Sequence, residues 1–234
     1  MPKNHLKTLN APKTWAIKRK KNVFITRPKP GAHSFKEGMP LNVLIRDILE
    51  YTDTKKEVKH ILMNKDILVD GKPRKDHRIL VGLMDVVSFP KKKEHLRLLF
   101  NKKGKIDVVK IKENESNIKI CKIKGKTIVK KGKIQLNLHD GKNILINKND
   151  YKVGDSLVLE LPALKIKEHL KLESKSTIYL TGGRHIAETG VIEDIKGENI
   201  VYKSESGEVY KTLKDYAFVV GKTKSLIELE NKNE

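Results

Sequence analysis

The chain opens with a run of cations that contains no acid. Residues 1–36 hold ten Lys and Arg and not one Asp or Glu, and four adjacent cations occupy positions 18–21. Folded surfaces normally mix charges of both signs, because uncompensated like charges repel one another. Such a segment is favoured when a partner supplies the negative charge, and a nucleic-acid backbone supplies it most densely. The composition of residues 1–36, which we call the leader, therefore predicts phosphate binding.

The basic charge is unevenly distributed along the 234 residues, whose formal net charge is +21. Residues 37–90 carry nine cations and nine acids, and residues 150–234 carry 13 and 15, whereas residues 91–149 carry 18 and five. Only seven of the 50 cations are Arg, so AT-rich coding alone is one explanation for the many lysines. Coding bias would spread Lys evenly along the chain. The cations are instead in excess in two blocks, residues 1–36 and 91–149, and this favours a nucleic-acid partner.

Residues that could perform catalysis or bind a metal do not gather in the sequence. No two of the eight histidines lie three or four residues apart, and no phosphate-cradling G-x-x-x-x-G-K-[ST] motif is present. Cys121 is the only cysteine, which rules out an internal disulfide and a multi-cysteine zinc site and favours a reducing, intracellular setting. Asp85 is more typical of a turn or core hydrogen bond than of a general base. We predict no catalytic residue, metal or cofactor.

The composition also restricts the partners. Apolar residues make up 38% of the chain, which suits several modest cores better than one large core. No apolar run approaches the ~20 residues that a membrane span requires. We expect no membrane partner, no small-molecule substrate and no homo-oligomer.

Two short helices are expected after the leader. Pro40 suits a first helical position, and apolar residues at 41, 44, 45, 48 and 49 form one helical face. Thr54 and Glu57 have the spacing of a capping box, which predicts the start of a second helix. This helix has an apolar face and, on another side, Lys55 and Lys59.

A hairpin should follow, because Asp70-Gly71 supplies the positive φ of a tight turn after the apolar residues 67–69. A second strand is expected over 81–89. From residue 95 onward the chain is predicted to be β-rich. In two places, Val108-Val109 and Ile120-Cys121, the alternation slips by one, which predicts bulges or sharp bends. The strands expected there cover 96–100, 106–111, 118–123, 134–138, 144–146, 157–161, 176–180, 191–195, 200–202, 208–212 and 216–220.

The two ends of the chain show no periodic pattern. The leader holds four of the eight prolines and is expected to be extended, with too little apolar surface to order itself alone. Trp15, the only tryptophan, would either pack on a neighbouring domain or stack on a base, and packing is the favoured interpretation. The polar tail after Leu229 is expected to be frayed.

Two segments resemble known RNA-associated modules. Residues 35–89 resemble the small fold named for ribosomal protein S4, in which a cationic helix and a hairpin bind structured RNA. Residues 176–221 resemble a KOW module, with Gly182, Gly183 and Gly190 at its glycine positions. Ala187 and Glu188 depart from the KOW pattern, and with a local net charge near zero this departure favours a protein or structural role for the loop.

The order of the parts resembles one family over nearly the whole chain, the archaeal and eukaryotic small-subunit ribosomal proteins S4e. The segments that carry the likeness are 5–7, 11–15, 27–28, 70–74, 82–87, the glycine loop and 218–221. The resemblance implies a cytoplasmic, ribosomal protein that binds small-subunit rRNA and neighbouring ribosomal proteins. An RNA-modifying enzyme and a transcription factor that use these modules for targeting are the alternatives.

The expected fold is α+β and multi-module. It consists of a basic extended arm (1–36), an S4-like helix–helix–hairpin domain (37–90), a central β-rich, barrel-like domain (91–165), a KOW-type small β-barrel (166–223) and a tail (224–234). The glycines of the candidate site are Gly71, Gly182, Gly183 and Gly190. The RNA-binding residues that we predict are Lys3, His5, Lys7, Lys13, Lys18, Arg19, Lys20, Lys21, Arg27, Lys29, His33, Lys36, Lys55, Lys56, Lys59, Lys72, Arg74, Lys75, Lys91, Lys92, Lys93 and Arg97.

Overall fold

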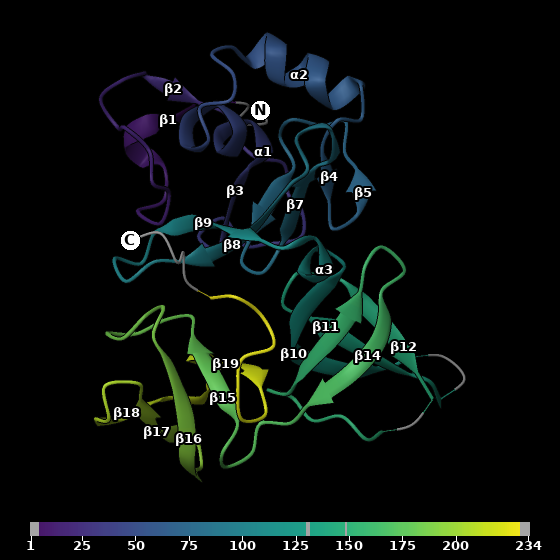
Figure 1. Cartoon of the computed structure of the whole chain (residues 1–234), viewed down its shortest axis with the longest axis vertical. Coiled ribbons are helices and arrows are strands. Elements are labelled where there is room, and N and C mark those ends of the chain that lie inside the picture. The colour runs from purple at the N-terminus through teal and green to yellow at the C-terminus, as the bar shows by residue number, and fades with distance from the viewer. Residues whose placement is uncertain (1–4, 130–131, 148, 230–234) are drawn as a thin grey trace. The chain divides into compact units, whose positions relative to one another are not determined.

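The computed structural model describes residues 5–129, 132–147 and 149–229 (Figure 1). The chain forms two compact units, the first made of Met1–Leu99 with Lys105–Asn117 and the second of Phe100–Gly104 with Ile118–Glu234. It is mostly β-structure with few helices, which confirms the predicted α+β, multi-module class in this coarse form. The finer division into five segments stays a prediction.

None of the helices in the described ranges has the length and apolar character needed to cross a lipid bilayer.

The first unit begins with the leader, and its described part is ordered by contacts that include Trp15 docked on the residues that follow the leader, in line with the expectation that it cannot order itself alone. Strand β1 (Leu6–Lys7) pairs with β2 (Phe24–Ile25). Trp15 is 1% exposed, and its indole Nε1 donates to the Gly38 carbonyl at 2.8 Å. The Arg19 guanidinium donates to backbone carbonyls of the leader itself. Packing of Trp15 is thus confirmed, and it supplies the apolar burial that orders the segment.

The two predicted helices are present. The first is a short α-turn, α1 (Leu41–Val43), that continues as a π-helical turn, η2 (Leu44–Ile48), and the residues at its buried face are Leu41, Leu44 and Ile45. The second is α2 (Lys55–Met63), which begins with the predicted capping box. The Thr54 hydroxyl accepts from the Glu57 amide at 3.3 Å, and the Glu57 carboxylate accepts from the Thr54 amide at 3.4 Å. Two amides that would otherwise lack partners are satisfied in this way.

The hairpin lies in a five-stranded sheet of order β5-β4-β7-β8-β9. Asp70 and Gly71, with φ of 52° and 72°, make the predicted turn between β4 (Leu68–Val69) and β5 (Lys72–Pro73). The other strands are β7 (Val86–Phe89), β8 (Glu94–Phe100) and β9 (Ile106–Ile111).

The single strand predicted over 81–89 is wrong. It is two strands, β6 (Leu80–Gly82), which pairs with β3 (Gly38–Pro40), and β7. The break occurs because the Asp85 carboxylate accepts from the Gly82 amide at 2.9 Å and closes a turn. Asp85 also bonds to His33 Nε2 at 2.7 Å, which confirms its predicted hydrogen-bonding role.

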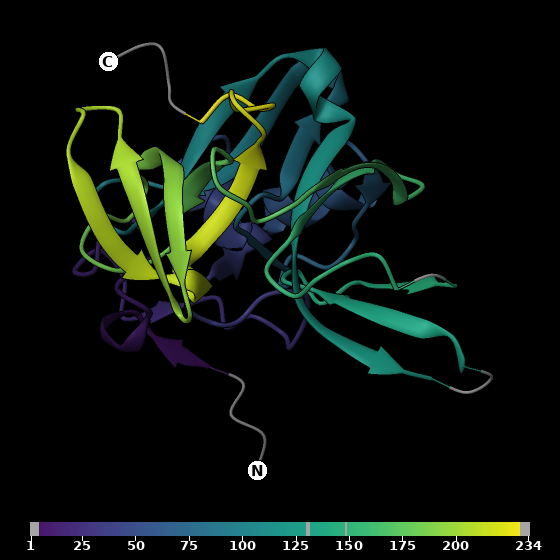
Figure 2. The ribbon, with the colours of Figure 1, turned by 90° about the horizontal axis from the view of Figure 1, so that it is seen from below.

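The central sheet of the second unit has the order β12-β11-β10-β13-β14. Figure 2 shows β10 and β11 running side by side as a long hairpin. Among the described residues the pairing is that of an open sheet with edges β12 and β14, whereas the sequence predicts a barrel-like region. Its core is formed by Cys121, Ile123, Leu136, Leu138, Leu157 and Leu159. The strands are β10 (Ile118–Ile128), β11 (Ile134–Leu138), β12 (Asn143–Ile146), β13 (Ser156–Glu160) and β14 (Lys165–Leu170).

Of the bulge or sharp bend predicted at Ile120-Cys121, the bulge is excluded, since β10 pairs with β13 in unbroken register from residue 118 to 122. The alternation slips because both faces of β10 are buried there, so apolar residues occur on each. The register shifts further along, between Ile123 and Gly125. Strand β14 is missing from the prediction because charged side chains at Lys165, Lys167 and Glu168 hide its few apolar residues.

The last sheet has the order β18-β17-β16-β15-β19, and its strands agree with those predicted to within two residues at each end. They are β15 (Thr177–Leu180), β16 (Thr189–Lys196), β17 (Asn199–Ser204), β18 (Val209–Leu213) and β19 (Ala217–Gly221). The remaining short helices of the described chain are η1 (Thr8–Asn10), η3 (Pro90–Lys92), α3 (Glu113–Ser116) and η5 (Lys214–Tyr216). The predicted fraying beyond Leu229 lies outside the described residues.

Candidate nucleic-acid interface

Helix α2 presents three of the predicted cations to solvent. Val58 and Leu62 are buried against the first unit, and this fixes the opposite side of the helix outward. Lys55, Lys56 and Lys59 are exposed there, and none has a carboxylate within ion-pairing distance among the residues that the structure describes. Their charge is therefore available to an external anion.

The lysines of α2 act electrostatically on the segment that follows β5, and the pKa of His77 shows this effect. Burial lowers the pKa of His77, and the charges of Lys55, Lys59 and Arg78 lower it further against the opposing effect of Asp76. Lysines of the helix therefore lie close enough to the hairpin segment for their fields to overlap. We call Lys55, Lys56, Lys59, Lys72, Arg74 and Lys75 the platform.

Two nitrogen atoms beside the platform lack partners within the described parts of the chain. Arg74 Nε and His77 Nε2 are both buried, and neither makes a hydrogen bond there. A buried polar group without a partner destabilises a fold by about 1–3 kcal/mol, and an anion or hydroxyl that reached it would remove this penalty. The hairpin turn, by contrast, is held by the protein alone, because the Asp70 carboxylate accepts a hydrogen bond from the Val86 amide at 3.1 Å.

Two acids of this unit are engaged inside the fold. Asp70 and Asp85 are buried, and their carboxylates accept backbone amides of Val86 and Gly82. The turn residue Gly71 contributes backbone geometry here, at φ 72°.

The cations that follow the hairpin are partly engaged within the protein. Lys91 pairs with Asp66 at 2.9 Å, and the Lys92 ammonium lies 3.5 Å from the centre of the Tyr51 ring. Lys93 is exposed. Arg97, by contrast, is 1% exposed and pairs with Glu115 at 3.3 Å, so it is a structural cation and its prediction as an RNA-binding residue is corrected.

The leader gives a similarly divided result. His33 is buried against Asp85, and this corrects its predicted RNA contact, because its ring cannot reach a surface ligand. Arg19 is half-buried and serves the leader's own carbonyls. Lys18 and Lys29 are exposed but pair with Glu50 and Asp76. Arg27 is half-buried, His5, Lys7, Lys13, Lys20, Lys21 and Lys36 are exposed, and Lys3 lies outside the described residues.

In the second unit, the glycine loop serves internal packing. A Cβ built on Gly182 would lie 2.6 Å from the Tyr216 ring, and one on Gly190 would lie 2.6 Å from both the Tyr202 ring and the Lys203 carbonyl oxygen. Gly183 has a φ of 84°. These glycines are required by the protein's own aromatic rings, so their presence alone does not indicate a contact with RNA.

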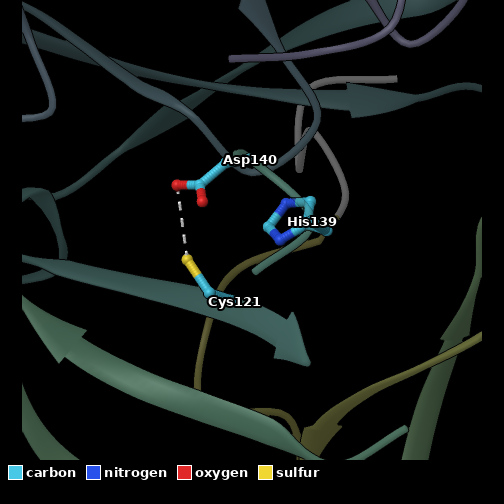
Figure 3. A group of neighbouring side chains, drawn as sticks. All are labelled: Cys121, His139 and Asp140. Atoms are coloured by element: carbon cyan, nitrogen blue, oxygen red, sulfur yellow. Dashed lines mark hydrogen bonds between the residues drawn. The ribbon is translucent and has the colours of Figure 1, made fainter. Parts of the chain in front are cut away.

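Cys121, His139 and Asp140 come together beside the central sheet (Figure 3). The Cys121 thiol is 3.6 Å from Asp140 Oδ2, but the same oxygen accepts from the Lys119 and Lys142 ammonium groups at 2.8 and 2.9 Å. Burial raises the pKa of Asp140, and these two cations outweigh burial and hold it well below its usual range. A divalent cation bound to this carboxylate would be repelled by the two ammonium groups beside it. The chemistry of the cluster is therefore that of an ion-pair network and not of a metal site.

Two buried lysines of β10 are structural residues that sequence reasoning missed. Lys119 is fully buried against Asp140. Lys122 Nζ donates to the carbonyls of Lys214, Asp215 and Ala217 at 3.3, 2.8 and 2.9 Å, and it ties β10 to the end of η5. Burial lowers the pKa of Lys122 to about 8. The only signal in the sequence was their position inside an apolar strand.

Comparisons with known proteins give a consistent result. Residues 92–166 match the model of "Ribosomal family S4e", and residues 1–36 match that of the "RS4NT (NUC023) domain". The small ribosomal subunit protein eS4 of Methanocaldococcus jannaschii is 44% identical over 97% of this chain and 98% of its own length. The eS4 protein of Methanosphaera stadtmanae is 43% identical over 99% and 98%.

A solved structure agrees with these matches. The crystal structure of the 30S ribosomal protein S4e from Thermoplasma acidophilum superposes with a TM-score of 0.69 at 32% identity, and the match covers 81% of this chain and 97% of that one. Since the sequence likeness extends over nearly the full length of both proteins, the chain belongs to ribosomal family S4e.

Proposed function

We propose that this protein is a structural constituent of the small ribosomal subunit that binds rRNA through the platform and the exposed cations of the leader. The unpaired, outward-facing lysines of α2 carry the proposal, because an anion of high charge density is the partner that such a surface fits. Its full-length relatives are named small ribosomal subunit proteins, which favours this function over an RNA-modifying enzyme or a transcription factor.

The platform would bind by position and shape. Lysine ammonium groups on a rigid helix contact phosphates without reading bases, and this suits a folded RNA of fixed backbone geometry. Each phosphate neutralised would contribute about −0.7 to −0.9 to the slope of log K against log salt. Several cations act together, so binding would weaken steeply as salt rises.

The second unit would serve assembly in a different way. Its last sheet has five strands, and its loop glycines, which resemble those of a KOW module in sequence, pack on Tyr202 and Tyr216. Residues 150–234 carry a net charge of only −2. We therefore assign this module to contact with neighbouring ribosomal proteins. The protein would act in the cytoplasm, within the ribosome.

Sedimentation of a cell lysate at rising salt tests the proposal. Stoichiometric comigration with the small subunit that persists to high salt is expected, and free or sub-stoichiometric protein would contradict it. Because Trp15 anchors the leader, removing residues 1–36 would disturb folding as well as binding. Lys20→Gln with Lys21→Gln is the better variant, since both side chains are exposed, and it should lower the salt at which the protein dissociates.

A further inference from the structure

The β1–β2 pair presents one aromatic ring to solvent. Leu6 pairs with Ile25 and Lys7 pairs with Phe24, and side chains alternate between the faces of a strand. Ile25 is buried, so Phe24 points to the opposite side, where it is 56% exposed. An exposed ring of this size offers a flat π-face to a partner.

Other groups around Phe24 extend this face. The His5 ring lies edge-on to Phe24, with ring centres 5.6 Å apart. Lys7 is the cross-strand neighbour of Phe24, and Lys21 lines the same shallow depression as Phe24. The face is therefore apolar at its centre and cationic around it.

The acids nearest this face are already neutralised. Asp47 and Glu50 line the same depression. Asp47 accepts two hydrogen bonds from the neighbouring Arg46 at 3.0 and 2.8 Å, and Glu50 pairs with Lys18 at 3.6 Å. Lys7 and Lys21 have no carboxylate within ion-pairing distance in the described parts of the chain. The uncompensated charge beside Phe24 is thus positive.

We propose that an unpaired nucleotide of the RNA stacks its base on Phe24, while Lys7 and Lys21 bind the phosphates on either side. This rests on the proposed function and adds a stacking contact to it. A flat ring with flanking cations fits a single-stranded nucleotide, because the base supplies a π-face and its backbone supplies the charge. An acidic protein segment would satisfy the lysines but would have no need for an aromatic ring.

Equilibrium binding of the full-length protein to in vitro transcribed small-subunit rRNA, measured over a range of salt, tests this contact. Phe24→Ala should weaken binding about tenfold with an unchanged salt slope, since stacking involves no counterion release. Phe24→Tyr should bind like the wild type. Phe24→Leu keeps apolar area without a π-face and should bind like Phe24→Ala. Val209→Ala is the matched control, since Val209 is 54% exposed on β18, and it should have no effect.

Each outcome decides the matter. Wild-type affinity for Phe24→Ala would overturn the stacking contact, and wild-type affinity for Phe24→Leu would show an apolar contact of another kind in its place. If the wild-type protein itself bound rRNA without salt dependence, the proposed function would fail. A steep wild-type slope with an unaffected Phe24→Ala variant would leave the proposed function intact and remove only the stacking contact.

Discussion

Helix α2 and strand β10 use the same residue type in opposite ways. Lys55 and Lys59 of α2 stand in solvent without an acidic partner among the described residues, whereas Lys119 and Lys122 of β10 are buried and fully engaged. The first pair is available to a phosphate. The second pair holds the second unit together, one lysine through Asp140 and the other through three backbone carbonyls.

The difference shows why net charge does not locate a binding surface. Residues 91–149 carry the largest excess, 18 cations against five acids, yet some of these cations are used inside the protein. Residues 37–90 have a net charge of zero and still form the platform, because the lysines of α2 have no ion-pair partner among the described residues, while Asp70 and Asp85 are buried on backbone amides. A lysine is therefore available to bind RNA only where no acid of the protein is placed to pair with it.

The largest effect is expected for Asp140→Ala, which leaves Lys119 buried without its carboxylate. We expect a loss of about 3–5 kcal/mol in the free energy of unfolding, measured by urea denaturation. The double variant Lys119→Met with Asp140→Leu removes both charges and should recover most of that loss. An Asp140→Ala protein as stable as the wild type would show that the pair is not structural.

Lys122 should give the fold a characteristic dependence on pH. Its pKa is about 8 in the folded protein and near 10.4 when unfolded, so the unfolded state binds more protons between these values. Stability contributed by this group therefore rises with pH from about 8 to 10.5, by roughly 3 kcal/mol, and is constant below pH 8. Urea denaturation of the wild type against Lys122→Met measures it. Parallel pH profiles for the two proteins would refute the assignment.

Arg74→Lys tests the buried donor of the platform while keeping its charge. Lys lacks the planar guanidinium and the Nε that is unsatisfied in this structure. Affinity for rRNA should fall about fivefold with an unchanged salt slope, equivalent to ~1 kcal/mol. Lys75→Arg, a charge-conserving change at an exposed neighbour, should leave binding as it was. Equal binding by Arg74→Lys would show that the Nε does not contact RNA.

The smallest effect is a titration shift at His77. Its pKa is held low by burial and by the lysines of α2, and phosphates that neutralise those lysines would raise it. NMR titration of the imidazole in the free protein and with bound rRNA should show an upward shift. An unchanged pKa would place the RNA away from the platform.

The platform was predictable because its signals are local. The Thr54–Glu57 capping box, the apolar face of the helix and the Asp70-Gly71 turn each need only a few adjacent residues, and the structure contains all three. They also fix the side on which Lys55 and Lys59 lie. Local sequence signals were therefore enough to predict the platform.

The rest depends on partners far along the chain. His33 and Arg97 look like exposed cations until Asp85 and Glu115 are brought beside them, 52 and 18 residues away. The order in the leader depends on Trp15 reaching the Gly38 carbonyl. No window of sequence contains these pairs, so their burial could not be predicted from pattern alone.

The central claim is that RNA binding depends on particular exposed cations, among them the lysines of α2, and not on the total basic charge. The direct measurement compares the salt dependence of rRNA binding for two double variants. One is Lys55→Gln with Lys59→Gln, and the other is Lys165→Gln with Lys167→Gln, which removes two exposed lysines from β14. The α2 pair should reduce the slope of log K against log salt by about 1.4–1.8, and the β14 pair should leave it unchanged. Equal slopes for the two variants would contradict the claim.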